Sequence, residues 1–161
     1  MSRKLMSALV AAVLVVPFAA RADGPVAPTG DEVKKVLEYF NNGKDSGPVL
    51  AELKPCLTVE SKNKTAPNFL ECTEPVSGKV KKGASVSAWM NWLVPKDGKY
   101  EDLSIQWICD GVVRTTQDLS LKMPQIGSRT WMSATANKAG KWEIKILQGA
   151  KELGSAKFEV E

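Results

Sequence analysis

The sequence predicts a mainly β protein, an antiparallel β-sandwich of about eight strands preceded by two short helices. Apolar and polar residues alternate in several short segments after Cys56, as expected for strands with one buried face. Turn signals separate these segments, among them the run 95–98 (PKDG) and the dipeptide Asp110-Gly111. Helical periodicity is confined to the residues before Cys56. Many short strands at regular spacing are typical of a sandwich.

The N-terminal residues have the features of a secretory signal peptide. Arg3 and Lys4 give a positive start, residues 5–18 are almost entirely apolar, and 20–22 (ARA) match the small-x-small cleavage pattern. The apolar run is shorter than the roughly 20 residues that span a bilayer. We therefore predict a signal peptide at 1–22, a periplasmic or secreted location, and no membrane insertion of the mature chain.

The next segments are predicted to be a flexible leader (23–28) and a helical region (29–55). Thr29 and Glu32 fit a capping box. An apolar face at i, i+3, i+4 and i+7 follows, made of Val33, Val36, Leu37 and Phe40. Pro48 suits the first turn of a second short helix, with an apolar side of Val49, Leu50 and Leu53.

The sandwich domain is predicted to span 56–161. Its main strands are expected at 84–93, 103–109, 112–121, 129–136, 141–147 and 152–160. In the first of these, Trp92 lies on the face that Val86, Ala88 and Met90 share, and Trp89 lies on the opposite face. We expect Trp92, Trp107 and Trp142 to belong to the core.

The chain has three cysteines, and an exported chain is expected to form at least one disulfide. A polar turn centred near Lys64 would bring Cys56 and Cys72 together on neighbouring strands of a hairpin. This geometry favours a Cys56–Cys72 bond and leaves Cys109 as a buried thiol. A bond between Cys72 and Cys109 is the alternative.

Composition excludes several classes of function. The chain has no histidine, which rules out a Ser-His-Asp triad, a Cys-His dyad and the usual histidine-ligated zinc or copper sites. Loss of the basic residues of the signal peptide lowers the formal charge from +4 to +1, so we expect no nucleic-acid partner. We expect no enzymatic activity, no cofactor and no metal site.

Spaced tryptophans and glycines in the second half of the chain carry a resemblance. The matching pieces are Trp107 with Gly111, residues 129–133 (RTWMS), residues 140–142 (GKW) and residues 158–160 (FEV). Over about residues 69–161 the chain resembles a family of bacterial envelope domains of unassigned function. This resemblance implies an immunoglobulin-like sandwich and an interaction or structural module, and it transfers no catalytic residues.

Three residues are candidates for contact with a partner. Trp89 and Trp131 fall on strand faces that the core does not require, and an exposed tryptophan can anchor a protein or stack on a sugar. Arg129 can hold a carboxylate or stack on an aromatic ring. The alternative is that these side chains are structural, with the N-terminal helices covering the tryptophans. The leading hypothesis is a non-enzymatic interaction module of the cell envelope, such as an accessory component of an envelope-spanning machine, with envelope proteins as partners. A module that binds cell-wall or surface polysaccharide is the second hypothesis.

Overall fold

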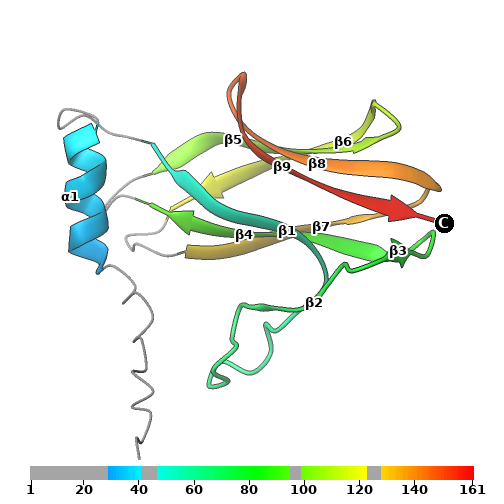
Figure 1. Cartoon of the computed structure of the whole chain (residues 1–161), viewed down its shortest axis with the longest axis horizontal. Helices are drawn as coiled ribbons and strands as arrows, with labels where there is room; N and C mark the ends of the chain where they lie inside the picture. Colours follow the sequence, from blue (N-terminus) through cyan, green and yellow to red (C-terminus); the bar gives the residue numbers. More distant parts are fainter. Residues whose placement is uncertain (1–28, 41–46, 95–98, 123–127) are drawn as a thin grey trace, which may run out of the picture.

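The computed structural model of the chain describes residues 29–40, 47–94, 99–122 and 128–161 (Figure 1). The predicted signal peptide and leader, and the predicted turn at 95–98, lie outside these residues. One helix and nine strands occur in the described part: α1 (Gly30–Phe40), β1 (Val49–Val59), β2 (Cys72–Pro75), β3 (Lys79–Val80), β4 (Ser85–Leu93), β5 (Tyr100–Cys109), β6 (Val112–Leu121), β7 (Ser128–Thr135), β8 (Gly140–Gln148) and β9 (Lys151–Val160). The additional strand relative to the prediction is the two-residue β3.

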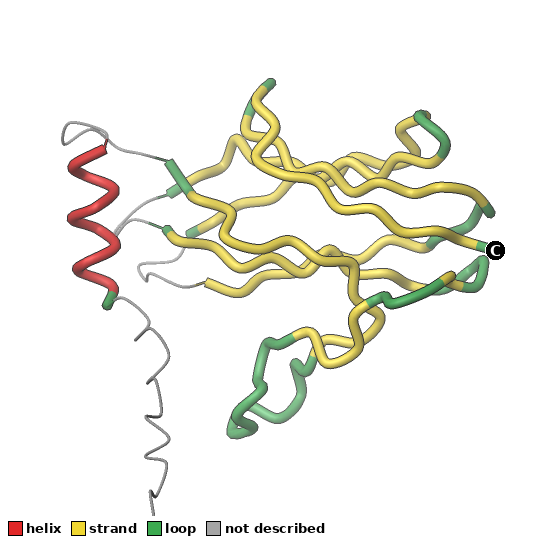
Figure 2. The backbone as a smooth tube through the Cα atoms, in the orientation of Figure 1, coloured by secondary structure: helices red, strands yellow, loops and turns green. Residues whose placement is uncertain are grey.

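The strands form two sheets, in the orders β2-β1-β4-β7 and β3-β9-β8-β5-β6. All pairs are antiparallel except β3 with β9. This is an immunoglobulin-like arrangement, because β4 and β7 take the places of strands B and E, and β9, β8, β5 and β6 those of G, F, C and C′. Figure 2 shows the two layers of strands and the long loop that projects from one of them. The predicted fold class is therefore confirmed for the sandwich.

The core lies between the two sheets and contains the three tryptophans assigned to it. Trp92, Trp107 and Trp142 are each at most 2% exposed. Trp142 stacks on Phe158 with ring centroids 5.9 Å apart. The inward face of β4 also follows the predicted alternation, since Val86, Ala88, Met90 and Trp92 all belong to the central cluster.

One glutamine links the two sheets at the side of β6 and β7. Gln117 Oε1 accepts a hydrogen bond from Trp107 Nε1 at 2.9 Å, and Gln117 Nε2 donates to the Ser133 carbonyl at 3.1 Å. The indole donor of a core tryptophan is thereby satisfied by a residue that also touches the other sheet.

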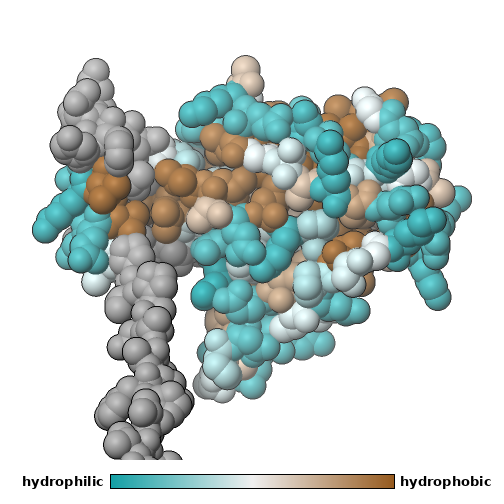
Figure 3. All heavy atoms as spheres, viewed as in Figure 1, coloured by the Kyte–Doolittle hydropathy of each residue, from teal (hydrophilic) through white to brown (hydrophobic). Residues whose placement is uncertain are grey.

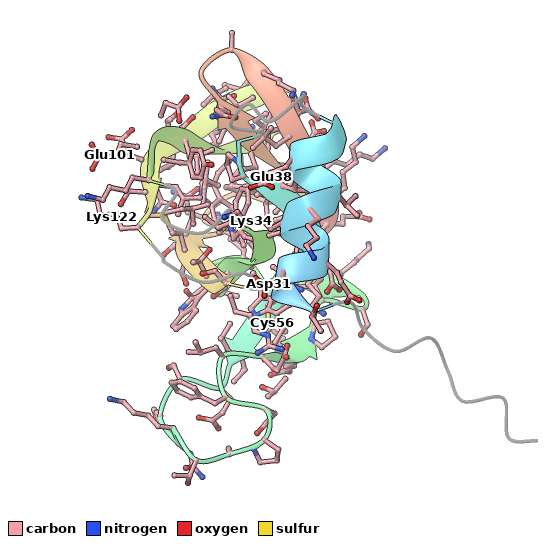
Figure 4. All side chains as sticks on the ribbon, turned by 90° about the vertical axis from the view of Figure 1, so that its left-hand side faces the viewer. Asp31, Lys34, Glu38, Cys56, Glu101 and Lys122 are labelled. Atoms are coloured by element: carbon pink, nitrogen blue, oxygen red, sulfur yellow. A yellow bond between two sulfur atoms is a disulfide. The ribbon has the colours of Figure 1, made fainter. Side chains whose placement is uncertain are left out.

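Helix α1 begins as the sequence predicts. Glu32 accepts hydrogen bonds from the Thr29 backbone N–H at 2.7 Å and its hydroxyl at 2.8 Å, and these bonds lower the pKa of the Glu32 carboxyl. The Glu32 N–H donates back to Thr29 Oγ1 at 3.4 Å, which completes the capping box. The helix lies across one end of the sandwich (Figures 1 and 4), with Lys34 and Glu38 paired along it at 3.6 Å.

The predicted second helix is wrong, because its apolar residues belong to β1. Leu50 pairs with Trp92 and Leu53 pairs with Met90, and both partners face the core. A register shift between Leu50 and Glu52 inserts one extra residue. This bulge brings residues three apart to the same face of a strand, a spacing that otherwise indicates a helix. The sandwich thus begins at Val49, before the predicted boundary at residue 56.

The hairpin between β5 and β6 has the predicted two-residue turn. Asp110 and Gly111 have φ values of 50° and 78°, both positive, as a type I′ turn requires. Asp110 Oδ1 accepts the Lys141 N–H at 3.0 Å, and this bond is the main cause of the lowered pKa of Asp110. Gly140 has a φ of 141°, and a Cβ there would lie 2.7 Å from Asp110 Oδ1, so this position requires glycine.

Where β1 and β9 approach each other, apolar side chains reach the surface. Leu50, Leu53 and Leu153 are partly buried against the core, and a Cβ on Gly154 would lie only 3.0 Å from Leu50. Figure 3 shows hydrophobic side chains extending from α1 across this region. No helix in the described part of the chain is long and apolar enough to cross a membrane.

Candidate functional site

The candidate contact residues gather on the outer face of the sheet β2-β1-β4-β7. Trp89 on β4 is the register partner of Trp131 on β7, and Asn91 is the partner of Arg129. On the other side of β4, Lys54 of β1 is the partner of Trp89. Directly opposite residues in an antiparallel pair point to the same face, so Lys54, Trp89 and Trp131 form one row.

A loop between β1 and β2 closes over part of this row. We call residues 60–71 the strap. Its base is fixed by the Cys56–Cys72 disulfide, which confirms the favoured pairing, and the remaining cysteine, Cys109, is a buried free thiol. The C-terminal end of the loop lies on the sheet, whereas its tip projects away from the sandwich (Figure 2); Cys56 marks its base in Figure 4.

Trp89 is buried under the strap even though it lies outside the central core. Only 2% of its surface is exposed. Its Nε1 donates to the Leu70 carbonyl at 2.7 Å, and Lys54 Nζ lies 4.4 Å from the centroid of its ring. The indole is therefore held by a hydrogen bond and a cation–π contact rather than by the N-terminal helices.

The strap is also tied to β7. Glu71 Oε1 lies 2.8 Å from the guanidinium of Arg129, so the arginine holds a carboxylate, one of the two roles considered from the sequence. Leu70 has a φ of 63°, which is unusual for a leucine, and its N–H donates to the Glu60 carbonyl at 2.6 Å. Leu70 and Glu71, at the C-terminal end of the strap, together with the disulfide, therefore fix its position on the sheet.

The tip of the strap has an internal hydrogen-bond network. Glu60 Oε1 accepts the N–H groups of Lys62 at 2.8 Å and Asn63 at 3.1 Å. These bonds, that of Asn63 first, lower the pKa of the Glu60 carboxyl. Asn63 Oδ1 in turn accepts from the Thr65 hydroxyl at 2.8 Å and from its N–H at 3.2 Å. The exposed tip is thus an organised turn, the kind of loop that often carries binding residues.

Of the two candidate tryptophans, Trp131 is the accessible one. It is half-buried, whereas Trp89 is enclosed. The side chain of Arg129 is 45% exposed and that of Glu71 33%. The open part of this face, which we call the platform, therefore consists of Trp131, Arg129 and Glu71.

Sequence reasoning identified two residues of the platform and missed the strap that completes it. Glu71 and Leu70 carry no motif, and their contacts depend on how the disulfide folds the loop back onto β4 and β7. The spacing of the two cysteines indicates a closed loop beside this sheet, but it does not indicate which side chains that loop contacts.

Elsewhere on the surface the described residues offer little chemistry. No group of three or more cysteine, aspartate or glutamate side chains among them is placed to hold a metal ion. A shallow groove of about 260 Å³ beside the Asp110-Gly111 turn is lined in part by Lys141, Glu143 and Lys157. Asp110 contributes a carboxylate to this groove, and that carboxylate already accepts a hydrogen bond from the Lys141 N–H.

Comparison with known proteins gives distant structural neighbours. No protein-family model and no curated protein matches the sequence. An immunoglobulin-like protein of Pseudomonas aeruginosa is 14% identical, with a TM-score of 0.47, and the match covers 74% of this chain and all of that one. The alkylpurine DNA glycosylase AlkC of Pseudomonas fluorescens, solved on DNA containing an abasic site analog, is 10% identical with a TM-score of 0.46. That match covers 80% of this chain and 34% of the glycosylase, so the present chain corresponds to about a third of it.

The glycosylase corrects one expectation. We predicted from the absence of histidine that the chain is not an enzyme, and this is contradicted by a structural neighbour that is one. The absence of histidine excludes particular catalytic groups, but not catalysis by other side chains. A likeness at 10% identity transfers no reaction to this chain.

Proposed function

We propose that this protein is an exported binding module of the bacterial cell envelope that engages an envelope protein through the strap and the platform. The observation that carries the proposal is the ordered strap, which stands out from the sandwich next to a half-buried tryptophan and an exposed arginine. Trp and Arg are among the residue types enriched in the hot spots of protein interfaces. An accessory subunit of an envelope-spanning machine is one form such a module takes.

Three further features support this proposal. The N-terminal sequence has the pattern of an export signal, and the Cys56–Cys72 bond is of the kind that persists in oxidising compartments. The resemblance of residues 69–161 to envelope domains agrees with the same location.

The test is co-purification of partners with the tagged full-length protein, expressed in its own cells and recovered from the envelope fraction. We expect a specific protein to be retained by the wild type and at least about tenfold less by Trp131→Ala. Lys157→Ala, an exposed change on β9 of the other sheet, is the matched control and should retain it. Circular dichroism of all three proteins checks that they are folded. Failure to recover any specific partner, or equal recovery by Trp131→Ala, would contradict the proposal.

Binding of a cell-wall or surface polysaccharide is the second candidate. It is favoured by Trp131 with Arg129 beside it, because sugar rings stack on tryptophan faces and their hydroxyls bond to charged neighbours. The test is titration of the intrinsic tryptophan fluorescence with peptidoglycan fragments and surface polysaccharide. A saturable change in the wild type that is lost in Trp131→Ala supports this candidate, and an unchanged signal excludes these ligands.

A further inference from the structure

Strand β7 is an edge strand of the sheet β2-β1-β4-β7 (Figure 1). Within the described part of the chain it pairs only with β4, and the pairing has no register shift. Just beyond the end of β7, the Ala136 N–H donates to the Ala84 carbonyl at 2.9 Å, which shows which backbone groups face β4. Backbone groups alternate in direction along an antiparallel pair. Those of residues 130, 132 and 134 therefore bond to β4, and those of residues 129, 131 and 133 point outward.

Several of these outward groups have no partner. The Ser133 carbonyl accepts a hydrogen bond from Gln117 Nε2 at 3.1 Å. In the described part of the chain, no other strand lies beside β7 to bond the N–H and carbonyl groups of Arg129 and Trp131, or the Ser133 N–H. A row of unpaired donors and acceptors therefore runs from Arg129 to Ser133, and the Gln117 side chain marks its end.

The β7 edge lacks the features that protect the other edges of the sandwich. Strands β2 and β3 have only four and two residues. On β6 the register partners pass from Thr115 to Val113, so Arg114 is a bulged, charged residue. Short strands, bulges and charges are the devices that keep an edge from pairing. Strand β7 has eight residues, and its single charge, on Arg129, is engaged by Glu71. This edge is thus the one best suited to accept another strand.

The place beside β7 is one that a strand fills in other immunoglobulin folds. In constant-type domains a strand D belongs to the same sheet as A, B and E. Here β7 takes the place of E, and the one strand between β5 and β7 in the chain, β6, pairs with β5 in the other sheet. The described residues therefore provide no strand D. The half-buried Trp131 of the platform lies at the middle of the edge that this leaves open.

We propose that β7 binds an extended segment of the envelope protein partner, which adds to the sheet as a strand beside residues 129–133. This inference rests on the proposed function and names the way in which the platform holds its partner. The Trp131 backbone exchanges hydrogen bonds with the partner residue directly opposite, and that residue's side chain lies beside the indole on the outer face. Main-chain bonds supply affinity in this mode and the side chains supply specificity. The segment is therefore recognised by its extended backbone and by an apolar residue that faces Trp131.

The first experiment compares two variants of Ser133 in the co-purification assay. Ser133→Pro removes the outward N–H and puts a ring carbon in its place, while the groups that bond to β4 are unchanged. Ser133→Ala loses the hydroxyl, which lies 2.8 Å from Ser87 Oγ, but keeps the N–H. We expect Ser133→Pro to retain the partner at least about tenfold less than the wild type, and Ser133→Ala to retain it equally. Circular dichroism checks that both variants are folded.

The second experiment needs no variant and measures amide hydrogen exchange by nuclear magnetic resonance. In the protein alone, the amides of Arg129, Trp131 and Ser133 should exchange faster than those of Thr130 and Met132, which bond to β4. Addition of the purified partner should slow exchange of the three outward amides at least about tenfold. This measurement decides the question if Ser133→Pro does not fold.

The outcomes separate this inference from the proposed function. A partner that Trp131→Ala loses but Ser133→Pro retains would overturn strand addition and leave the proposed function standing. Strand addition is also wrong if Ser133→Ala loses the partner as fully as Ser133→Pro, or if the outward amides still exchange freely in the complex. Slow exchange of these amides in the protein alone would mean that the edge is already paired, which overturns the proposal too. Failure to recover any specific partner would overturn both proposals.

Discussion

Removal of the Cys56–Cys72 bond should lower the free energy of unfolding by about 3 kcal/mol. The two cysteines are 16 residues apart in sequence. Closing a loop of that length removes conformational entropy from the unfolded chain equivalent to about 3 kcal/mol at 25 °C. The loss is large against the roughly 5–15 kcal/mol that stabilise a typical domain. The folded state is affected too, because the bond holds the strap against Trp89 and Arg129.

The assay is urea unfolding of the wild type and of the double variant C56A/C72A, followed by circular dichroism. The wild type in the presence of a thiol reductant is a second way to remove the bond, and it keeps both sulfur atoms. Cys109 is free in all three samples and does not affect the comparison. We also expect the dependence on urea to become steeper, because an unfolded chain without the cross-link exposes more surface.

A difference below about 1 kcal/mol in both experiments would refute this reasoning. It would mean that the unfolded chain is already compact between residues 56 and 72, or that the bond strains the folded hairpin. Agreement between the reduced wild type and the double variant would assign the effect to the cross-link. A loss seen only in the double variant would assign it to the missing side-chain atoms of Cys56, which is fully buried.

Three other predictions concern single residues. Gly140→Ala should destabilise the chain by about 2 kcal/mol or more, since a side chain is strained at that backbone angle and meets the carboxylate of Asp110; a stability within 0.5 kcal/mol of wild type in urea unfolding would contradict this. Folding lowers the pKa of the Glu60 carboxyl from its ordinary value of 4.5. The ionised carboxyl therefore stabilises the folded chain above pH 4.5, and this stabilisation is lost as the pH falls through the lowered pKa. The difference in stability between wild type and Glu60→Gln should therefore shrink between pH 6 and pH 3, and a constant difference would argue against the hydrogen bonds seen in the strap. Gln117→Met should cost about 1–3 kcal/mol by leaving the buried indole N–H of Trp107 without an acceptor; thermal unfolding measures this, and an unchanged midpoint would show that another group accepts the bond.

Local chemistry in the sequence was sufficient to predict several elements. The Thr29–Glu32 capping box and the Asp110-Gly111 turn involve neighbours in the chain, so the residues that decide them are adjacent and can be recognised. The alternation in β4 correctly separated Trp92 from Trp89 because every strand places successive side chains on opposite faces.

Features that depend on distant pairing were not predictable in the same way. The bulge in β1 gives Leu50 and Leu53 a helical spacing, and only the partners Trp92 and Met90 show that the segment is a strand. The cover over Trp89 also comes from a segment 19 residues away, through a backbone carbonyl whose residue type carries no information. Sequence alone could thus assign Trp89 to the outer face but could not say what covers it.

The position of the disulfide has a consequence for the mechanics of the chain. In antibody domains the conserved bond joins the two sheets, whereas here it joins adjacent strands of one sheet, β1 and β2. No disulfide joins the two sheets, since Cys109 is free, so a pulling force can separate them as far as the connecting segments of the chain allow. The disulfide also keeps the closed loop from being stretched out. The fully extended chain is therefore about 50 Å shorter with the bond than without it. A stretched molecule in an oxidising compartment would therefore reach full extension about 50 Å earlier than the same chain in a reducing one.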